Sequence, residues 1–100
     1  MYTAIRTYTT SDAPEVRRIT QEEFVPLVKD LPGFIGYYVV DAGDGRIASI
    51  TVCDEREDVE ESTKRATEWV RDRLSSLITS GPEVIMGDTV VSETASRVTT

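Results

Sequence analysis

The segment covering residues 34–53 constrains the fold more than any other part of the chain. Two runs of strand-forming residues, 34–40 and 46–53, are joined by residues 41–45, which read DAGDG. Glycines in so short a linker permit the left-handed backbone that tight hairpin turns need. The sequence therefore predicts a β-hairpin here.

The first strand of this hairpin has large apolar residues in both of its alternating sets. Ile35 falls in one set, for example, and Phe34 in the other. A strand with one face in water should alternate apolar with polar side chains. We therefore expect both faces of the hairpin to be covered.

The flanking segments predict two more strands and two helices. Residues 2–9 are rich in β-branched and aromatic side chains, and residues 84–92 form a similar last strand after the break at 80–82. Apolar residues recur at three- and four-residue spacing over residues 13–30 and again from Asp54, a candidate cap, to Leu77. Both helices are therefore predicted to be amphipathic.

Pro26 interrupts the first helix. Proline removes one backbone hydrogen bond and clashes with the preceding turn, so a kink or a restart is expected near residues 21–26. Thr20 and Glu23 have the spacing of a capping box for that restart.

The element order β-α-β-β-α-β predicts an α+β, ferredoxin-like fold. In it a four-stranded antiparallel sheet carries both helices on one face, so its other face is bare. A second sheet from an identical subunit is the simplest cover, because two-fold dimers are the commonest oligomers. The prediction is a homodimeric α/β barrel, with the domain at residues 1–93 and a polar C-terminal tail at residues 94–100.

Composition limits the partners of the chain. Eleven basic and eighteen acidic residues give a net charge of −7, which repels nucleic acid. No apolar run approaches the roughly 20 residues of a membrane span, and the N-terminus lacks the features of a signal peptide. Cys53 is the only cysteine, so no disulfide forms within the chain. The expected location is cytoplasmic.

Three features together resemble a known family: residues 31–37, LPGFIGY, the glycine-rich hairpin, and a second helix that carries Trp69. The chain is similar to the antibiotic-biosynthesis-monooxygenase-like (ABM) domains of the dimeric α/β barrel superfamily, over roughly residues 1–93. The resemblance implies the dimeric barrel fold. Family members include cofactor-independent oxygenases of aromatic polyketides or quinols, haem-degrading enzymes and small proteins without an assigned activity.

Two residue types needed for the family's best-known chemistry are absent. Its haem-degrading enzymes combine an asparagine, a tryptophan and a histidine, and its polyketide oxygenases combine an asparagine, a tryptophan and an arginine. This chain contains no histidine and no asparagine. We therefore expect no haem or other cofactor, and no metal site of the usual histidine and cysteine ligands.

Two residues remain as candidates for catalysis. Trp69 could stack on an electron-rich substrate, although a tryptophan beside a helical stripe is more often part of the core. Arg6 lies roughly where the family's asparagine would be and could stabilise an anion, although such an arginine more often forms a salt bridge at the strand edge or across the dimer. Tyr8, Tyr37 and Tyr38 could offer hydroxyls to a ligand, and strand packing explains them equally well.

Three functions are compatible with these residues. The first is a dimeric protein that binds a small apolar or aromatic molecule between the sheet and the helices. The second is a cofactor-independent monooxygenase, in which Trp69 would stack on an aromatic or quinol-type substrate and Arg6 would stabilise its anion. The third is a structural or regulatory dimerisation module.

Overall fold

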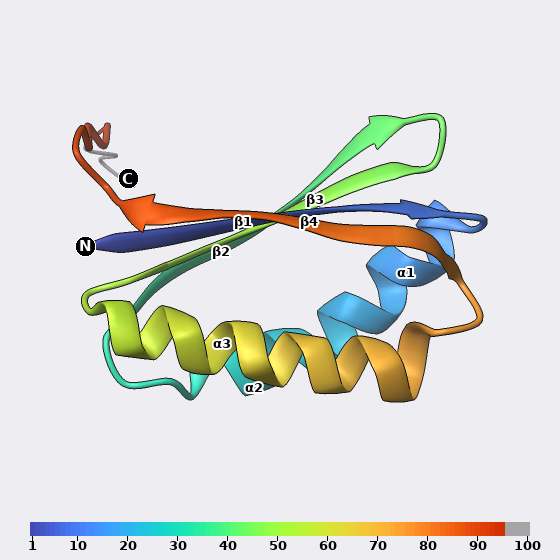
Figure 1. Cartoon of the computed structure of the whole chain (residues 1–100), viewed down its shortest axis with the longest axis horizontal. Helices are drawn as coiled ribbons and strands as arrows, with labels where there is room; N and C mark the ends of the chain where they lie inside the picture. Colours follow the sequence, from blue (N-terminus) through green and yellow to red (C-terminus); the bar gives the residue numbers. More distant parts are fainter. Residues whose placement is uncertain (96–100) are drawn as a thin grey trace, which may run out of the picture.

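A computed structural model describes residues 1–95 and confirms the ferredoxin-like α+β architecture (Figure 1). The strands lie in the order β2-β3-β1-β4, and all neighbours are antiparallel. All helices cover one face of the sheet. In chain order the elements are β1 (Tyr2–Thr10), α1 (Ala13–Ile19), η1 (Thr20–Phe24), α2 (Val25–Lys29), β2 (Phe34–Gly43), β3 (Arg46–Cys53), α3 (Arg56–Trp69), η2 (Val70–Leu74) and β4 (Ile78–Asp88).

The predicted hairpin is present and tighter than expected. The first strand continues to Gly43, so only Asp44 and Gly45 remain as the turn, with φ values of 55° and 75°. Positive φ at both central residues is typical of the two-residue Asp-Gly turn whose twist matches that of the strands. A side chain at Gly45 would also meet the Thr10 carbonyl oxygen at 2.5 Å.

Each of the two long helical segments contains a π-helical turn. The irregularity predicted near Pro26 is confirmed, because the π-helical turn η1 directly precedes α2, which has Pro26 in its first turn. The predicted capping box is wrong, because the chain stays helical here. The Thr20 hydroxyl donates to the Val16 carbonyl at 2.7 Å, and Glu23 binds residues of another helix.

The second long helix begins and ends slightly differently from the prediction. It starts at Arg56 with Glu55 at its N-cap, and no side chain caps it, so the assignment of Asp54 as the cap is wrong. The backbone N–H of Asp54 instead donates to the Gly33 carbonyl at 2.8 Å and belongs to the end of the hairpin. The helical segment ends with η2 at Leu74, before the predicted Leu77.

The last strand is also displaced from the prediction, because it covers Ile78–Asp88 and not residues 84–92. Residues 80–82 were expected to break the chain, yet they lie inside the strand. The pairing with β1 shifts register there, and Gly81 has a φ of 110°, so an irregular strand accommodates the Gly-Pro pair. Residues 89–95 form no helix or strand, and the rest of the tail, residues 96–100, lies outside the described residues.

The core between the sheet and the helices consists of three groups of buried side chains. One surrounds Phe24 and Val28, the second contains Val16 and Leu74, and the third lies at Cys53. Trp69 packs against the first two groups and so connects them. No helix within residues 1–95 is long and apolar enough to cross a membrane.

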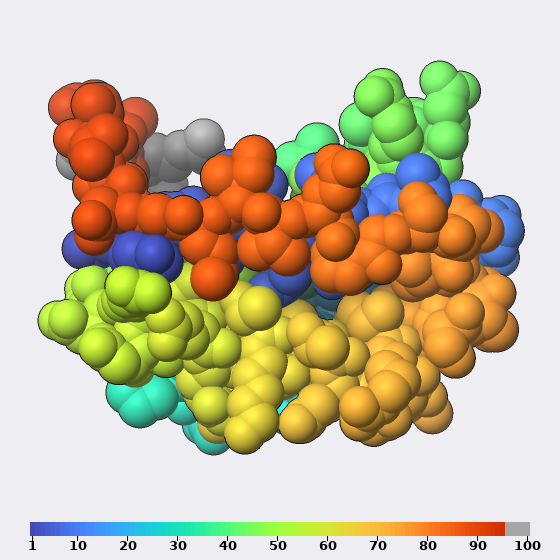
Figure 2. All heavy atoms as spheres, in the orientation of Figure 1, coloured from blue at the N-terminus to red at the C-terminus, as the bar shows by residue number. Residues whose placement is uncertain are grey.

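The face of the sheet opposite the helices carries a continuous apolar row. Strand register places one residue from each strand side by side: Tyr38, Ile50, Ile5 and Ile85. Tyr38 is 58% exposed and Ile85 71% exposed. No helix of residues 1–95 covers this face (Figure 1), and the end of the hairpin stands above it (Figure 2).

Candidate functional site

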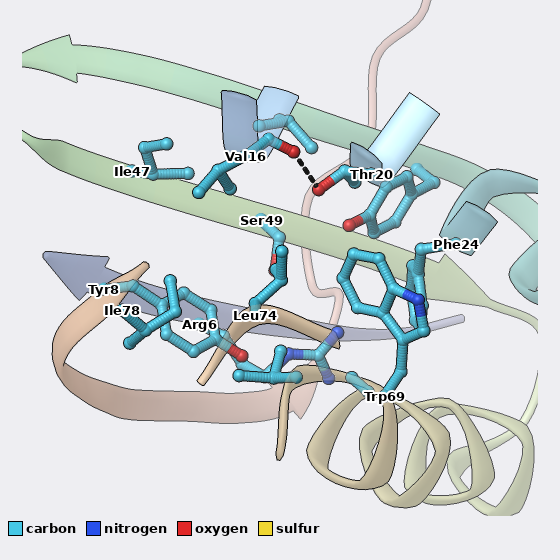
Figure 3. A pocket seen from close by; sticks show the side chains of 14 residues that line it. Arg6, Tyr8, Val16, Thr20, Phe24, Ile47, Ser49, Trp69, Leu74 and Ile78 are labelled. Carbon is cyan, nitrogen blue, oxygen red and sulfur yellow. Dashed lines mark hydrogen bonds between the residues drawn. The ribbon is translucent and has the colours of Figure 1, made fainter. Parts of the chain in front are cut away.

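A cavity of ≈ 30 Å³ lies between the sheet and the helices (Figure 3). Its walls come from both layers and from both π-helical turns. The sheet contributes Arg6, Tyr8, Tyr37, Val39, Ile47, Ser49 and Ile78, and the helices contribute Val16, Thr20, Phe24, Ala66, Trp69, Val70 and Leu74. The lining is mostly apolar and contains no carboxylate, so its one charged side chain dominates the electrostatics.

That charged side chain is Arg6, which is only 2% exposed. β1 aims it at the helices, where its Nη1 donates to the Thr63 hydroxyl at 3.1 Å. Its Nε is buried without a hydrogen-bond partner, and no carboxylate within residues 1–95 forms a salt bridge with it. Burying a charge without its counter-ion costs several kcal/mol, so the fold maintains this cation at the expense of stability.

The strand register explains why the arginine has no acidic neighbour. Across the helix-facing side of the sheet, Arg6 lies beside Ser49 of β3 and Val84 of β4, and Val39 follows on β2. Of these side chains, only the Ser49 hydroxyl is polar. The predicted alternative was a salt bridge of Arg6 at the strand edge or across the dimer. Within residues 1–95 no salt bridge of Arg6 is formed, and one across a dimer stays a prediction.

Tyr8 and Tyr37 bring two hydroxyls to the same space. Burial raises the pKa of Tyr37 to about 12, although the Arg6 cation and a hydrogen bond with Ser49 act in the opposite direction. Burial likewise raises the pKa of Tyr8, and the charge and hydrogen bonding of Arg6 oppose it. Both phenols are therefore neutral near pH 7 and can donate hydrogen bonds, but neither supplies the missing negative charge.

Trp69 is at once a core residue and a wall of the cavity. Its ring centroid lies 5.1 Å from that of Phe24, and the Phe24 and Tyr37 centroids are 5.4 Å apart, both pairs being tilted. Such tilted aromatic pairs are favourable beyond the area they bury. The three rings line the cavity together with Arg6.

Glu23 connects the two helical walls from outside. Its carboxylate accepts hydrogen bonds from Trp69 Nε1 at 3.3 Å and from Arg73 Nε and Nη2 at 2.7 and 2.9 Å. The hydrogen bonds from Arg73, followed by that from Trp69, lower the pKa of this carboxyl. Sequence reasoning missed this role, because nothing local in the sequence indicates a contact between residues 50 positions apart.

The structure thus brings together four of the five residues singled out in the sequence. Arg6, Tyr8, Tyr37 and Trp69 all line the cavity. Tyr38 does not, because the alternation of β2 points it to the opposite face, where it belongs to the apolar row. Within residues 1–95 no group of three or more histidine, cysteine, aspartate or glutamate side chains could hold a metal ion.

A second, wider groove of ≈ 730 Å³ lies between the end of the hairpin and the start of β4. Thr7, Arg46 and Glu83 are among its lining residues. It is open to solvent, and its charged residues are exposed, so it lacks the buried unpaired cation that distinguishes the first cavity.

Several solved structures have a similar fold. A protein of unknown function from Nitrosomonas europaea superposes with a TM-score of 0.76 at 8% identity, covering 96% of this chain and 95% of that chain. The ActVA-Orf6 monooxygenase from Streptomyces coelicolor, in complex with nanaomycin D, gives 0.73 at 15% identity, covering 95% and 92%. SnoaB, a cofactor-independent oxygenase from Streptomyces nogalater, gives 0.70 at 15% identity, covering 91% and 94%.

Sequence comparison adds nothing to this likeness. No family model matches the chain, and no curated protein matches it in sequence. The fold is that of the ABM-like domains, as the resemblance of the sequence implied. At these identities the likeness is one of fold, so function has to be argued from the cavity.

Proposed function

We propose that the protein is a homodimeric ABM-like domain that binds a small aromatic molecule in the cavity between the sheet and the helices. The observation that carries the proposal is Arg6, a buried cation beside three aromatic rings that has no counter-ion among residues 1–95. A buried charge kept only for structure is normally paired. An unpaired one in a cavity is better explained by a ligand that completes its surroundings.

The size of the cavity limits how a ligand can bind. A volume of ≈ 30 Å³ holds about two water molecules, whereas pockets for drug-sized ligands measure roughly 300–1,000 Å³. A ring therefore enters only if lining side chains move. Residues of η1 and η2 line the cavity, and π-helical turns often occur at functional sites. We place the movement at these two turns.

The homodimer is supported by the apolar row of Tyr38, Ile50, Ile5 and Ile85 on the open face. A row that crosses every strand of the sheet leaves a broad apolar surface in water, and such surfaces usually mark an interface. A second copy carries the same apolar row, so the rows of two copies can cover each other under two-fold symmetry. The cavity lies on the other side of each sheet, so each copy keeps its own.

Fluorescence of Trp69 tests the binding proposal, because this is the only tryptophan in the chain and it lines the cavity. Phenol, benzoate and benzamide are titrated into the protein, and the emission is followed with excitation at the red edge of the indole band. Saturable changes are expected with at least one of them. Emission that never saturates for any of the three contradicts the proposal.

A matched pair of variants locates the binding. Ala66→Leu adds a larger side chain to the cavity, where Ala66 is 2% exposed, and should abolish the saturable change. Lys64→Leu makes an apolar change on the exposed side of the same helix and should leave it intact. Equal responses in both variants would place the ligand elsewhere.

A second candidate, a cofactor-independent monooxygenase, is favoured by the meeting of Trp69 and Arg6 in one cavity. Two proteins of similar fold are described as oxygenases. In this reaction Trp69 would stack on a quinol-type substrate and Arg6 would stabilise its anion for reaction with oxygen. Aerobic incubation with dihydroxynaphthalene should then consume oxygen, and Trp69→Phe and Arg6→Ala should slow it. Absence of oxygen uptake by the parent protein rules out this candidate for that substrate class.

A further inference from the structure

We propose that the cavity selects a monocarboxylate with a planar apolar body, and that the carboxylate binds the edge of Arg6 formed by Nε and Nη2. This inference rests on the proposed function, because it names the chemical class of the molecule held in the cavity. It is carried by the hydrogen-bond geometry of one side chain and by the charges of its neighbours.

The geometry concerns the two edges of the guanidinium group. Nη1 is occupied, since it donates to the Thr63 hydroxyl at 3.1 Å and so fixes the orientation of the plane. Nε shares the other edge with Nη2, and Nε is buried without a hydrogen-bond partner within the described residues. Two parallel N–H groups on one edge match the two oxygens of a carboxylate, which is the pairing that arginine forms most favourably.

The charges around Arg6 leave room for one negative group. The cavity has no carboxylate in its lining, and the two tyrosines next to the cation, Tyr8 and Tyr37, are held neutral by burial. A ligand with one negative charge neutralises the site. A second negative charge would be buried without a partner, which is costly in apolar surroundings.

The remaining lining describes the rest of the ligand. Phe24, Tyr37 and Trp69 surround the cavity with ring surfaces, which favours a flat apolar body attached to the carboxylate. The net charge of −7 repels every anion in proportion to its charge, so it disfavours a monocarboxylate less than a highly charged anion. Neutral molecules of the same shape lose the charge-assisted hydrogen bonds, and they are expected to bind more weakly.

Calorimetric titration with benzoate and benzamide tests the inference. The two molecules have the same ring and nearly the same size, and only benzoate carries a negative charge. We expect benzoate to bind at least about tenfold more tightly, because charge-assisted bonds are roughly twice as strong as neutral ones. In Arg6→Gln the ratio of the benzoate affinity to the benzamide affinity should fall to about one. Arg6→Lys keeps the positive charge but lacks the two parallel N–H groups, so it should retain part of the preference for benzoate.

A measurement on the unaltered protein covers the case in which the Arg6 variants do not fold. In the nitrogen–proton spectrum of the arginine side chains, the Arg6 Nε–H signal should move downfield with benzoate, because this hydrogen forms a new bond to a charged oxygen. Benzamide should leave the signal nearly unchanged. Assignment follows from the loss of the signal in Arg6→Lys or, if that variant is unfolded, from through-bond spectra of the parent.

The possible outcomes separate this inference from the proposed function. If neither molecule binds, the proposed function fails and the inference fails with it. If both bind equally, the cavity is an aromatic site and only the selectivity for carboxylates is wrong. A preference for benzoate without any movement of the Arg6 Nε–H signal would show that another cation selects the anion, and that result also overturns the inference.

Discussion

Arg73 on η2 donates two hydrogen bonds, of 2.7 and 2.9 Å, to the carboxylate of Glu23 on η1, 50 positions earlier in the chain. Trp69 donates a third to the same carboxylate. These bonds join the two π-helical turns that wall the cavity. We predict that a molecule entering between these turns has to break this connection, so that Glu23 limits access to the cavity.

Removal of the charge of Glu23 should loosen the wall. In Glu23→Gln we expect a red shift of Trp69 emission, because the indole becomes more hydrated, and faster association of aromatic ligands in stopped-flow measurements. The melting temperature should fall only slightly, since the salt bridge is largely exposed.

Glu22→Gln is the matched control for this change. Glu22 pairs with Arg18 on the outer side of the same helical segment, away from the cavity lining. This variant should keep the emission and the association rate of the parent. Identical behaviour of the two variants would contradict the role assigned to Glu23.

The hydrogen bonds from Arg73 and Trp69 to Glu23 should also weaken in acid. Hydrogen bonding to Arg73 lowers the pKa of Glu23 below its ordinary value of 4.5, so the stabilisation is complete above that value and is lost as the pH falls through the lowered pKa. Trp69 emission should therefore shift with a midpoint below pH 4.5. In Glu23→Gln this transition should disappear, and its persistence would assign it to another carboxyl.

Tyr37 should make the stability of the protein fall at high pH, whereas the Glu23 connection is lost at low pH. Its pKa is raised from 10.0 to about 12, so the stabilisation is complete below pH 10 and is lost as the pH rises towards 12. A difference of two pKa units corresponds to about 3 kcal/mol in the free energy of unfolding. Urea unfolding at several pH values should show this loss in the parent and a smaller loss in Tyr37→Phe. If the free energy of unfolding falls equally with pH in the two proteins, Tyr37 is not buried as described.

The open face of the sheet should hold two copies together. Ile50 lies at the centre of the apolar row, between Tyr38 and Ile5, so Ile50→Lys places a charge in the proposed interface. Sedimentation at micromolar concentration should give a dimer for the parent and a monomer for this variant. Thr67→Lys, an exposed change on α3, should remain dimeric. A monomeric parent would contradict the homodimer.

The sequence was sufficient for most of the fold because the signals were local. The Asp-Gly turn of the hairpin, the two amphipathic helices and the effect of Pro26 each depend on neighbouring residues. The predictions were wrong where tertiary contacts determine the bounds of an element or its cap. β4 begins six residues early because β1 offers it partners as far as Thr10, and Asp54 is not a cap because its backbone bonds to Gly33.

The candidate site was predictable only in part. Arg6, Tyr8, Tyr37 and Trp69 were recognised as residue types able to bind an aromatic anion, and strand alternation can place the first two on one face of the sheet. The absence of a counter-ion for Arg6 depends on the strand register, which puts Ser49 and Val84 beside it. The role of Glu23 depends on two helices meeting in space, so the sequence gives no local sign of it.

The most direct test of the central claim is to locate a bound aromatic molecule on the protein by NMR. Titration with benzoate or phenol should move the indole Nε1–H signal of Trp69 and the signals of Phe24 and Tyr37, which line the cavity. The account predicts that these changes saturate together. Changes confined to Tyr38, Ile50 and Ile85 on the open face, or no change at all, would contradict it.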